Sequence, residues 1–163
     1  MKQPHDYREL GLPGAARVAA RCFLFESFLE ALLRKEPGAL IFQSGPANLA
    51  LHAHCHVKAT LQSGAAESLA NRRPGCATTA LDTGCCGMAG AFGAMKTKYE
   101  LSRQIGAALA TKIAQQPAGT TVVASGASCR QQITHLTSRR PKHLAEVLAA
   151  ALPLEPPAAR ERV

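Results

Sequence analysis

The sequence of 163 residues contains no tryptophan, and aromatic residues make up only 4% of it. A core built from this sequence must therefore consist mainly of alanine, leucine, valine and isoleucine, and the 47% hydrophobic content is enough for one compact domain. No segment approaches the ~18 consecutive apolar residues of a membrane-spanning helix. The first residues, MKQPHDYREL, lack the apolar core of a secretory signal. These absences predict a cytoplasmic protein without a transmembrane segment.

Long basic runs are also missing, although the formal net charge is +8. Basic side chains occur singly or in pairs such as Arg72–Arg73 and Arg139–Arg140, and aromatic residues do not alternate with them. This distribution does not predict nucleic-acid binding. The positive charge is compatible instead with docking against an acidic protein surface.

Three short segments rich in apolar or β-branched residues predict strands, at residues 47–54, 76–84 and 120–126. Each is followed by a segment with helical periodicity, at residues 55–70, 88–115 and 127–137. Alternating strands and helices predict an α/β fold with right-handed crossovers and a parallel sheet. We expect a three-layer, Rossmann-like βαβαβα core.

The two ends of the chain carry additional signals. Apolar residues recur at helical spacing over residues 14–36, and Pro141 is suited to the first turn of a C-terminal helix. The last residues are rich in proline and charge, which predicts a flexible tail. The predicted division is an N-terminal helix with its connector at 1–46, a cysteine-rich domain at 47–152 and the tail at 153–163.

Six cysteines occur in a sequence without an export signal, so reduced thiols are expected. Cys55 follows the first predicted strand, Cys85 and Cys86 follow the second, and Cys129 follows the third. Because the carboxyl ends of parallel strands lie at the same edge of a sheet, we expect these four thiols to meet there. Four thiolates select zinc or an iron–sulfur cluster, and the Cys-x-x-Cys pairs of common zinc modules are missing.

The two other cysteines have simpler interpretations. Cys22 lies on the apolar face of the predicted N-terminal helix and is expected in its core, and Cys76 opens a predicted strand and is expected in the core or at the strand edge. An alternative use of Cys85 and Cys86 is direct thiol–disulfide exchange, but a disulfide between adjacent cysteines closes a strained eight-membered ring.

Small and polar residues surround the four thiols. Glycines let the backbone turn tightly and approach a bulky group, and an aspartate at the end of a strand can cap free N–H groups. Histidines flank Cys55, and strand alternation would put His52, His54 and His56 on one face. They either complete a mixed zinc site or hydrogen-bond to cluster sulfurs. The residues expected to shape the site are Gly84, Gly87, Gly126, His54, His56 and Asp82.

The motifs HAHCHVKA, LDTGCCGMAGAFG, VVASGASCRQQI and RRPKHLAEVL carry a resemblance over residues 49–148. This region resembles the cysteine-rich CCG domain of heterodisulfide reductase B-like proteins. It is most similar to the C-terminal iron–sulfur part of FAD/FMN-containing dehydrogenases for D-2-hydroxy acids such as glycolate, D-lactate and D-2-hydroxyglutarate.

The resemblance implies that Cys55, Cys85, Cys86 and Cys129 hold an iron–sulfur cluster that relays electrons from a flavin to an acceptor. In the fullest form of the family a further cysteine stands where this chain has Gly126. Four ligands suit an ordinary [4Fe-4S] cluster better than the non-cubane site of that fullest form.

The flavin domain and ferredoxin-type cysteine runs of the resembling dehydrogenases do not occur in these residues. We therefore expect a separate subunit or a fragment of a larger dehydrogenase, not a complete enzyme. The FAD would belong to a flavoprotein partner or to a missing domain, and any membrane association would be peripheral, through the complex. The alternatives are a zinc-binding scaffold domain and a thiol–disulfide (heterodisulfide) reductase module.

Overall fold

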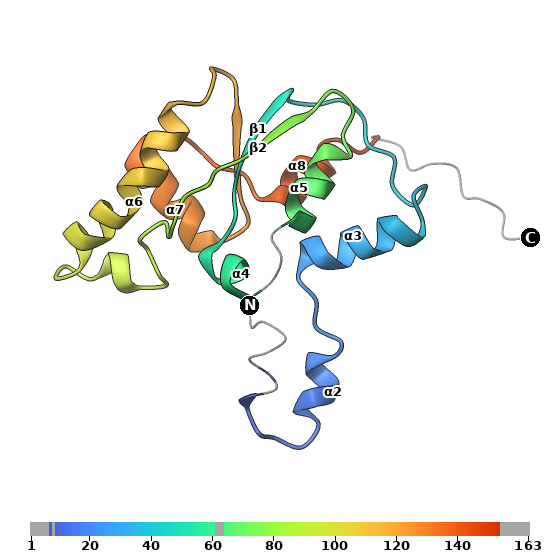
Figure 1. The fold of residues 1–163 in the computed structure, drawn as a ribbon, viewed down its shortest axis with the longest axis horizontal. Coiled ribbons are helices and arrows are strands. Elements are labelled where there is room, and N and C mark those ends of the chain that lie inside the picture. Colours follow the sequence, from blue (N-terminus) through green and yellow to red (C-terminus); the bar gives the residue numbers. More distant parts are fainter. Residues whose placement is uncertain (1–6, 8, 61–63, 154–163) are drawn as a thin grey trace, which may run out of the picture. The chain divides into compact units, whose positions relative to one another are not determined.

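The computed structural model describes residue 7 and residues 9–60 and 64–153, apart from the side chains of His56 and Thr60. The chain divides into two compact units, Met1–Ala39 and Leu40–Val163 (Figure 1). The boundaries predicted at residues 46 and 152 stay predictions, and the predicted tail beyond Pro153 lies outside the described residues. Within the described part of the chain, no helix is both long and apolar enough to cross a lipid bilayer.

The described part of the first unit includes the helices α2 (Ala15–Ala19) and α3 (Phe25–Lys35). The prediction of one continuous helix over residues 14–36 is therefore wrong. Leu24, the N-cap of α3, is extended with φ −69° and ψ 147°, and such a residue interrupts helical hydrogen bonding. Cys22 lies in this interruption and is half-buried, so it is not a helical core residue.

The second unit is built on three parallel strands, β1 (Asn48–His52), β2 (Ala77–Ala80) and β3 (Thr121–Ala124). Their order is β2-β1-β3, and Leu49 of the central strand pairs with both outer strands. The predicted α/β class with a parallel sheet is thus confirmed. A bridge between Val123 and Lys142 adds one further residue beside β3, which the sequence did not predict.

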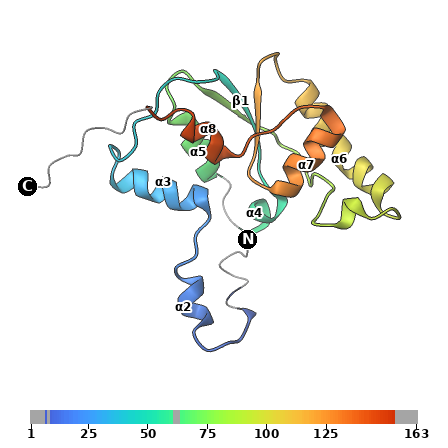
Figure 2. The ribbon, with the colours of Figure 1, turned by 180° about the vertical axis from the view of Figure 1, so that it is seen from behind.

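The helices of this unit form two pairs. Contacts join α6 (Tyr99–Ala114) to α7 (Ala127–Thr137) and α5 (Gly64–Asn71) to α8 (Leu144–Ala149). In both views the two pairs lie on opposite sides of the strands (Figures 1 and 2). The short helix α4 (Cys55–Thr60) directly follows β1. The Rossmann-like layering in its full form stays a prediction.

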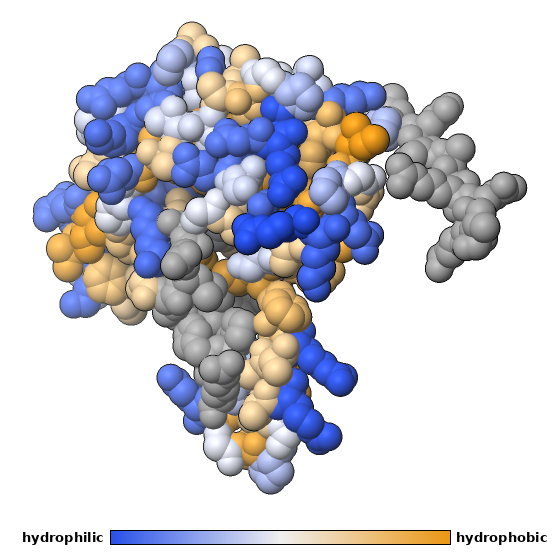
Figure 3. All heavy atoms as spheres, turned by 45° about the vertical axis from the view of Figure 1, so that its right-hand side comes forward, coloured by the Kyte–Doolittle hydropathy of each residue, from blue (hydrophilic) through white to orange (hydrophobic). Residues whose placement is uncertain are grey.

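The core of the second unit is aliphatic, as the composition predicts. Central strand β1 is buried along almost its whole length, and β3 is buried beyond its first residue. Strand β2 is mostly exposed, so it depends on pairing with β1 more than on burial of its side chains. On the surface in view in Figure 3, hydrophilic and hydrophobic side chains are interspersed.

The helix predicted over residues 88–115 begins later than expected. It starts only at Tyr99, after a turn of 3-10 helix at Phe92–Ala94. Gly87, Ala89 and Gly90 have φ of 90°, 42° and 66°, and such left-handed residues cannot extend a helix.

The C-terminal helix begins at Leu144, not at Pro141. His143 forms a capping box there, because its side chain accepts from the Ala145 N–H and Glu146 Oε1 accepts from the His143 N–H, both at 3.0 Å. The cap satisfies N–H groups that would otherwise lack partners at the start of the helix.

Candidate functional site

The four cysteines predicted to meet lie at the carboxyl ends of the three strands. Cys55 is the first residue of α4, which follows β1. Cys85 and Cys86 lie in the loop after β2, and Cys129 lies in the first turn of α7, after β3. The parallel sheet therefore brings three distant sequence segments to one edge, as expected from its topology.

The four thiols lie within interaction distance of one another. The thiols of Cys55 and Cys85 are hydrogen-bonded, and so are those of Cys86 and Cys129. Cys129 also interacts electrostatically with both Cys55 and Cys85. The predicted convergence is present, and the role of the thiols as ligands stays a prediction.

The other two cysteines do not follow strands of the sheet. Cys22 belongs to the first unit, and the Cys76 sulfur lies 3.8 Å from the Thr78 hydroxyl at the start of β2. All six cysteines are free thiols. Cys76 is half-buried, in keeping with its predicted place at the strand edge.

Burial and hydrogen bonding shift the pKa values of Cys85, Cys86 and Cys129 in different directions. Burial raises the pKa of Cys85, and the Gly87 N–H partly offsets this by donating to its sulfur at 3.3 Å. The hydrogen bond from Cys129 lowers the pKa of Cys86 to about 4. The same bond, together with burial, raises the pKa of Cys129. Cys86 and Cys129 therefore share one proton and one negative charge near neutral pH.

Two glycines allow the loop that carries Cys85 and Cys86, called the cysteine loop below, to lie directly against the backbone of α6. A Cβ on Gly87 would overlap the carbonyl oxygen of Ser102, and the positive φ of Gly87 already disfavours a side chain. On the helix side, a Cβ on Gly106 would lie 2.7 Å from the Cys86 carbonyl oxygen. The backbone of α6 therefore fixes the position of Cys86.

The remaining residues expected to shape the site fall into two groups. A Cβ on Gly126 would lie 2.6 Å from the His54 ring and 3.1 Å from the Cys129 sulfur, so this glycine is needed between them. Gly84 faces open space and Asp82 is exposed, and their part in shaping the site stays a prediction. The side chain of His56 lies outside the part of the chain that the structure describes.

The predicted alternation of three histidines along one strand is wrong, because β1 ends at His52 and His56 belongs to α4. His52 is instead the histidine buried at the site, with 1% of its surface exposed. Its Nδ1 lies 3.3 Å from the Thr83 hydroxyl. After the bond from Cys129, His52 is a further cause of the low pKa of Cys86. The sequence signalled His52 only as one of the three histidines close to Cys55.

Two cations also contact backbone carbonyls around the site. Arg130 Nη1 donates to the carbonyl oxygens of Ala124 at 3.0 Å and Ser125 at 2.8 Å, which fixes the turn between β3 and α7. Lys58 Nζ donates to the Thr83 carbonyl and joins α4 to the cysteine loop. The sequence carries no signal for either of these contacts.

Among the described side chains of residues 9–60 and 64–153, a set that does not include His56, no three His, Cys, Asp or Glu residues are grouped so that they could hold a single metal ion. The zinc interpretation, whether with four thiols or with added histidines, therefore finds no preformed single-ion site in this part of the chain.

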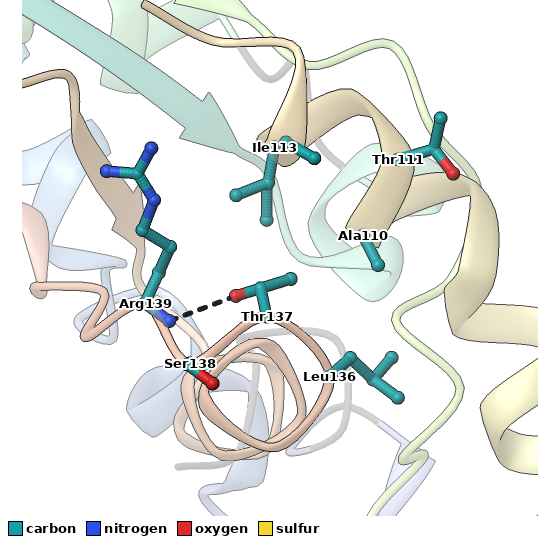
Figure 4. A pocket seen from close by; sticks show the side chains of 8 residues that line it. Ala110, Thr111, Ile113, Leu136, Thr137, Ser138 and Arg139 are labelled. Atoms are coloured by element: carbon teal, nitrogen blue, oxygen red, sulfur yellow. Dashed lines mark hydrogen bonds between the residues drawn. The ribbon is translucent and has the colours of Figure 1, made fainter. Parts of the chain in front are cut away.

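A separate cavity of about 480 Å³ lies between the C-terminal ends of α6 and α7 (Figure 4). Ile113 and Leu136 line it, and the Arg139 N–H donates to the Thr137 hydroxyl at its edge, at 3.2 Å. Along α7, Thr137 lies roughly 12 Å from Cys129 at the ordinary helical rise. None of the four thiols lines this cavity.

The sequence is 36% identical over 107 residues to a subunit of the anaerobic glycerol-3-phosphate dehydrogenase of Escherichia coli strain K12, and equally to the same subunit of strain O157:H7. The match covers 66% of this chain, and the chain spans 27% of the length of these curated relatives. No family model matches the sequence, and no solved structure matches it. Because the relatives are dehydrogenase subunits, they support the oxidoreductase part of the resemblance and leave the D-2-hydroxy acids untested.

Proposed function

We propose that this chain is the iron–sulfur component of a flavin-linked oxidoreductase, with Cys55, Cys85, Cys86 and Cys129 as the cluster ligands. The observation that carries the proposal is the convergence of these four thiols from three strand ends. The CCG-type motifs and the similarity to a dehydrogenase subunit support the same class of protein.

The donor set fits an iron–sulfur cluster, whose usual protein ligands are four cysteine thiolates. When bound, such a cluster takes up and releases single electrons. The chain supplies the rest of the environment: Cys86 and Cys129 are buried away from water, and the Gly87 N–H already donates to the Cys85 sulfur. Hydrogen bonds of this kind to cluster sulfurs tune the reduction potential.

The electrons would come from a flavin on a partner flavoprotein or on another domain and leave to a quinone or another acceptor. The relatives act in the oxidation of glycerol 3-phosphate, and the family resemblance points to D-2-hydroxy acids. Both kinds of substrate are alcohols that carry an anionic group and are oxidised to a carbonyl. We infer that the partner flavoprotein oxidises a substrate of this type, and that the +8 charge favours docking to an acidic surface of it. A cytoplasmic location, with any membrane contact made through the complex, completes the proposal.

Anaerobic reconstitution with iron and sulfide tests the cluster. Wild-type protein should turn brown and bind iron and sulfide in equal numbers. Replacing Cys129 by Ser should abolish most of this binding. Replacing Cys76 by Ser should leave it intact, because Cys76 precedes β2 and its sulfur lies 3.8 Å from the Thr78 hydroxyl.

The competing functions predict different results in the same experiment. A colourless wild-type protein that binds one zinc ion would establish the scaffold alternative. Dithiol reductase activity in the iron-free protein, lost on replacing Cys85 by Ser, would establish the thiol–disulfide alternative.

A second experiment tests the electron source. The oxidised, brown protein is mixed with a flavin-dependent glycerol-3-phosphate dehydrogenase or a flavin-dependent D-lactate dehydrogenase, each with its own substrate. Bleaching of the visible absorbance by one flavoprotein identifies the substrate class. A loaded protein that neither flavoprotein nor dithionite can bleach would refute electron relay.

A further inference from the structure

The imidazole of His52 presents a buried nitrogen that lacks a hydrogen-bond partner among the described residues. The residue ends β1, is 1% exposed, and its Nε2 is fully buried. A buried polar atom left unpaired destabilises the folded state, so such atoms in a folded protein call for a physical reason. An apolar residue of similar size at the end of β1 would leave no nitrogen unpaired, so the presence of a histidine at this position calls for an explanation.

The other ring nitrogen is already engaged. Nδ1 lies 3.3 Å from the Thr83 hydroxyl, whose residue stands two positions before Cys85. The Thr83 carbonyl is held in turn by Lys58, so the loop that carries this hydroxyl is fixed at two points. His52 interacts with the Cys86 thiol and lowers its pKa. Because Nδ1 faces Thr83, Nε2 is the nitrogen left for this interaction.

The chemistry of the two ends of the ring decides the tautomer. A neutral imidazole carries one N–H, and the hydrogen bond made by one nitrogen determines which nitrogen holds the proton. A Cys86 sulfur that serves as a ligand is deprotonated and can only accept a hydrogen bond. An Nε2 lone pair facing it would be repelled, whereas an Nε2–H would be satisfied, with the Thr83 hydroxyl donating to Nδ1.

We propose that His52 is a positioning residue that, held in the Nε2–H tautomer by the Thr83 hydroxyl, donates a hydrogen bond to the Cys86 sulfur. This inference rests on the proposed function, because the accepting sulfur is that of a proposed cluster ligand. Donation to a ligand sulfur stabilises the reduced, more negative state of a cluster, so the hydrogen bond raises its reduction potential. His52 thereby tunes a ligand without being one.

Redox titration of the reconstituted protein tests the hydrogen bond. Replacing His52 by Leu removes the donor at similar volume and should shift the reduction equilibrium about tenfold toward the oxidised state, which is ~59 mV for one electron. His52→Gln keeps an amide N–H near the position of Nε2 and should restore most of the potential. Thr83→Val should lower the potential by less than His52→Leu does. The matched control is His135→Leu, which removes a histidine whose Nε2 pairs with Tyr99 and should change nothing.

Nitrogen-15 spectra of the imidazole rings supply a readout that does not need a cluster. In the iron-free protein, His52 should carry its proton on Nε2, and Thr83→Val should shift the resonance of Nδ1 in His52 but not in His135. A proton on Nδ1 of His52 would overturn the inference, as would a His52→Leu protein with full iron content and the wild-type potential.

The two proposals can fail separately. A wild-type protein that binds no iron refutes the proposed function, while its imidazole spectra still report the tautomer. A loaded protein with the wrong tautomer refutes only the role of His52. If His52→Leu does not fold, the Gln variant and Thr83→Val decide through the same potential and spectra.

Discussion

Replacing Gly87 by Ala should destabilise the fold and displace the paired cysteines. Gly87 has φ 90°, and an added Cβ would overlap the Ser102 carbonyl oxygen of α6. A side-chain rotation cannot relieve this overlap, because the Cβ is attached directly to the backbone and the Ser102 oxygen is a backbone atom. The loop must therefore move away from α6 and take the Cys86 sulfur with it.

The expected magnitude follows from two contributions. A residue with a Cβ at strongly positive φ costs about 1–3 kcal/mol. Forcing apart two packed backbone segments costs about 1–3 kcal/mol more, as overpacking does in cores. The sum of about 2–6 kcal/mol is a large fraction of the 5–15 kcal/mol that typically stabilises a domain.

Two neighbouring glycines separate these contributions. Gly84 has open space around it, so Gly84→Ala should be neutral or slightly stabilising. Gly90 also faces open space but has φ 66°, so Gly90→Ala should show the backbone strain alone, about 1–2 kcal/mol. Gly87→Ala should exceed both.

Urea unfolding of the iron-free protein, followed by circular dichroism because the chain has no tryptophan, measures the three variants. The reasoning is refuted if Gly87→Ala unfolds at the same midpoint as Gly84→Ala. Iron binding gives an independent check, since only the Gly87 variant should lose affinity among the three.

Two further predictions concern the support and the charge of the site. Gln132→Leu removes hydrogen bonds to the buried Ser102, at 3.0 Å to its Oγ and 3.3 Å to its carbonyl, and should cost about 1–2 kcal/mol in urea unfolding. The exposed Gln131→Leu control should stay within about 0.5 kcal/mol of wild type, and equal losses would contradict the assignment. For the pH dependence, the lowered pKa of Cys86, about 4 against an ordinary 9.0, contributes stability that is present above pH 9.0 and lost as the pH falls through about 4. The raised pKa of Cys129 contributes stability that is present below 9.0 and lost at higher pH. Between about 4 and 9.0 the folded pair holds one proton and the unfolded chain two, so the unfolding free energy of the iron-free protein should rise with pH over this range and fall above it. Urea titrations across the range check this, and an equally steep rise in Cys86→Ala would contradict it.

The sheet and the meeting of the thiols were within reach of the sequence. Three runs predict strands whose observed bounds lie inside the predicted ranges. Burial on both faces gives β1 and β3 a continuous apolar pattern, whereas β2 is mostly exposed. Once the strands are parallel, the places of Cys55 and Cys129 after β1 and β3 bring them to one edge. The parallel direction of the strands is sufficient for this prediction.

The features that the sequence did not reveal depend on backbone conformation and on single-residue boundaries. Helical periodicity over 88–98 is misleading, because side-chain spacing does not report the left-handed φ of Ala89 and Gly90. The sequence predicts that Gly87 makes room for a bulky group, and the structure shows that it makes room for α6. Strand alternation groups His52 with its neighbours because the end of a strand cannot be located to one residue from propensity.

The direct backbone contact between the cysteine loop and Gly106 has a consequence for how the sequence of α6 can vary in length. One residue inserted or deleted before Gly106 would rotate the rest of the helix by roughly 100°. The neighbouring Ile105 or Ala107 would then turn a side chain toward the Cys86 carbonyl oxygen, which leaves no room for one. Inserting a whole turn would restore the rotation but would shift Gly106 along the helix axis by roughly 5 Å. This half of α6 should therefore tolerate neither insertions nor deletions.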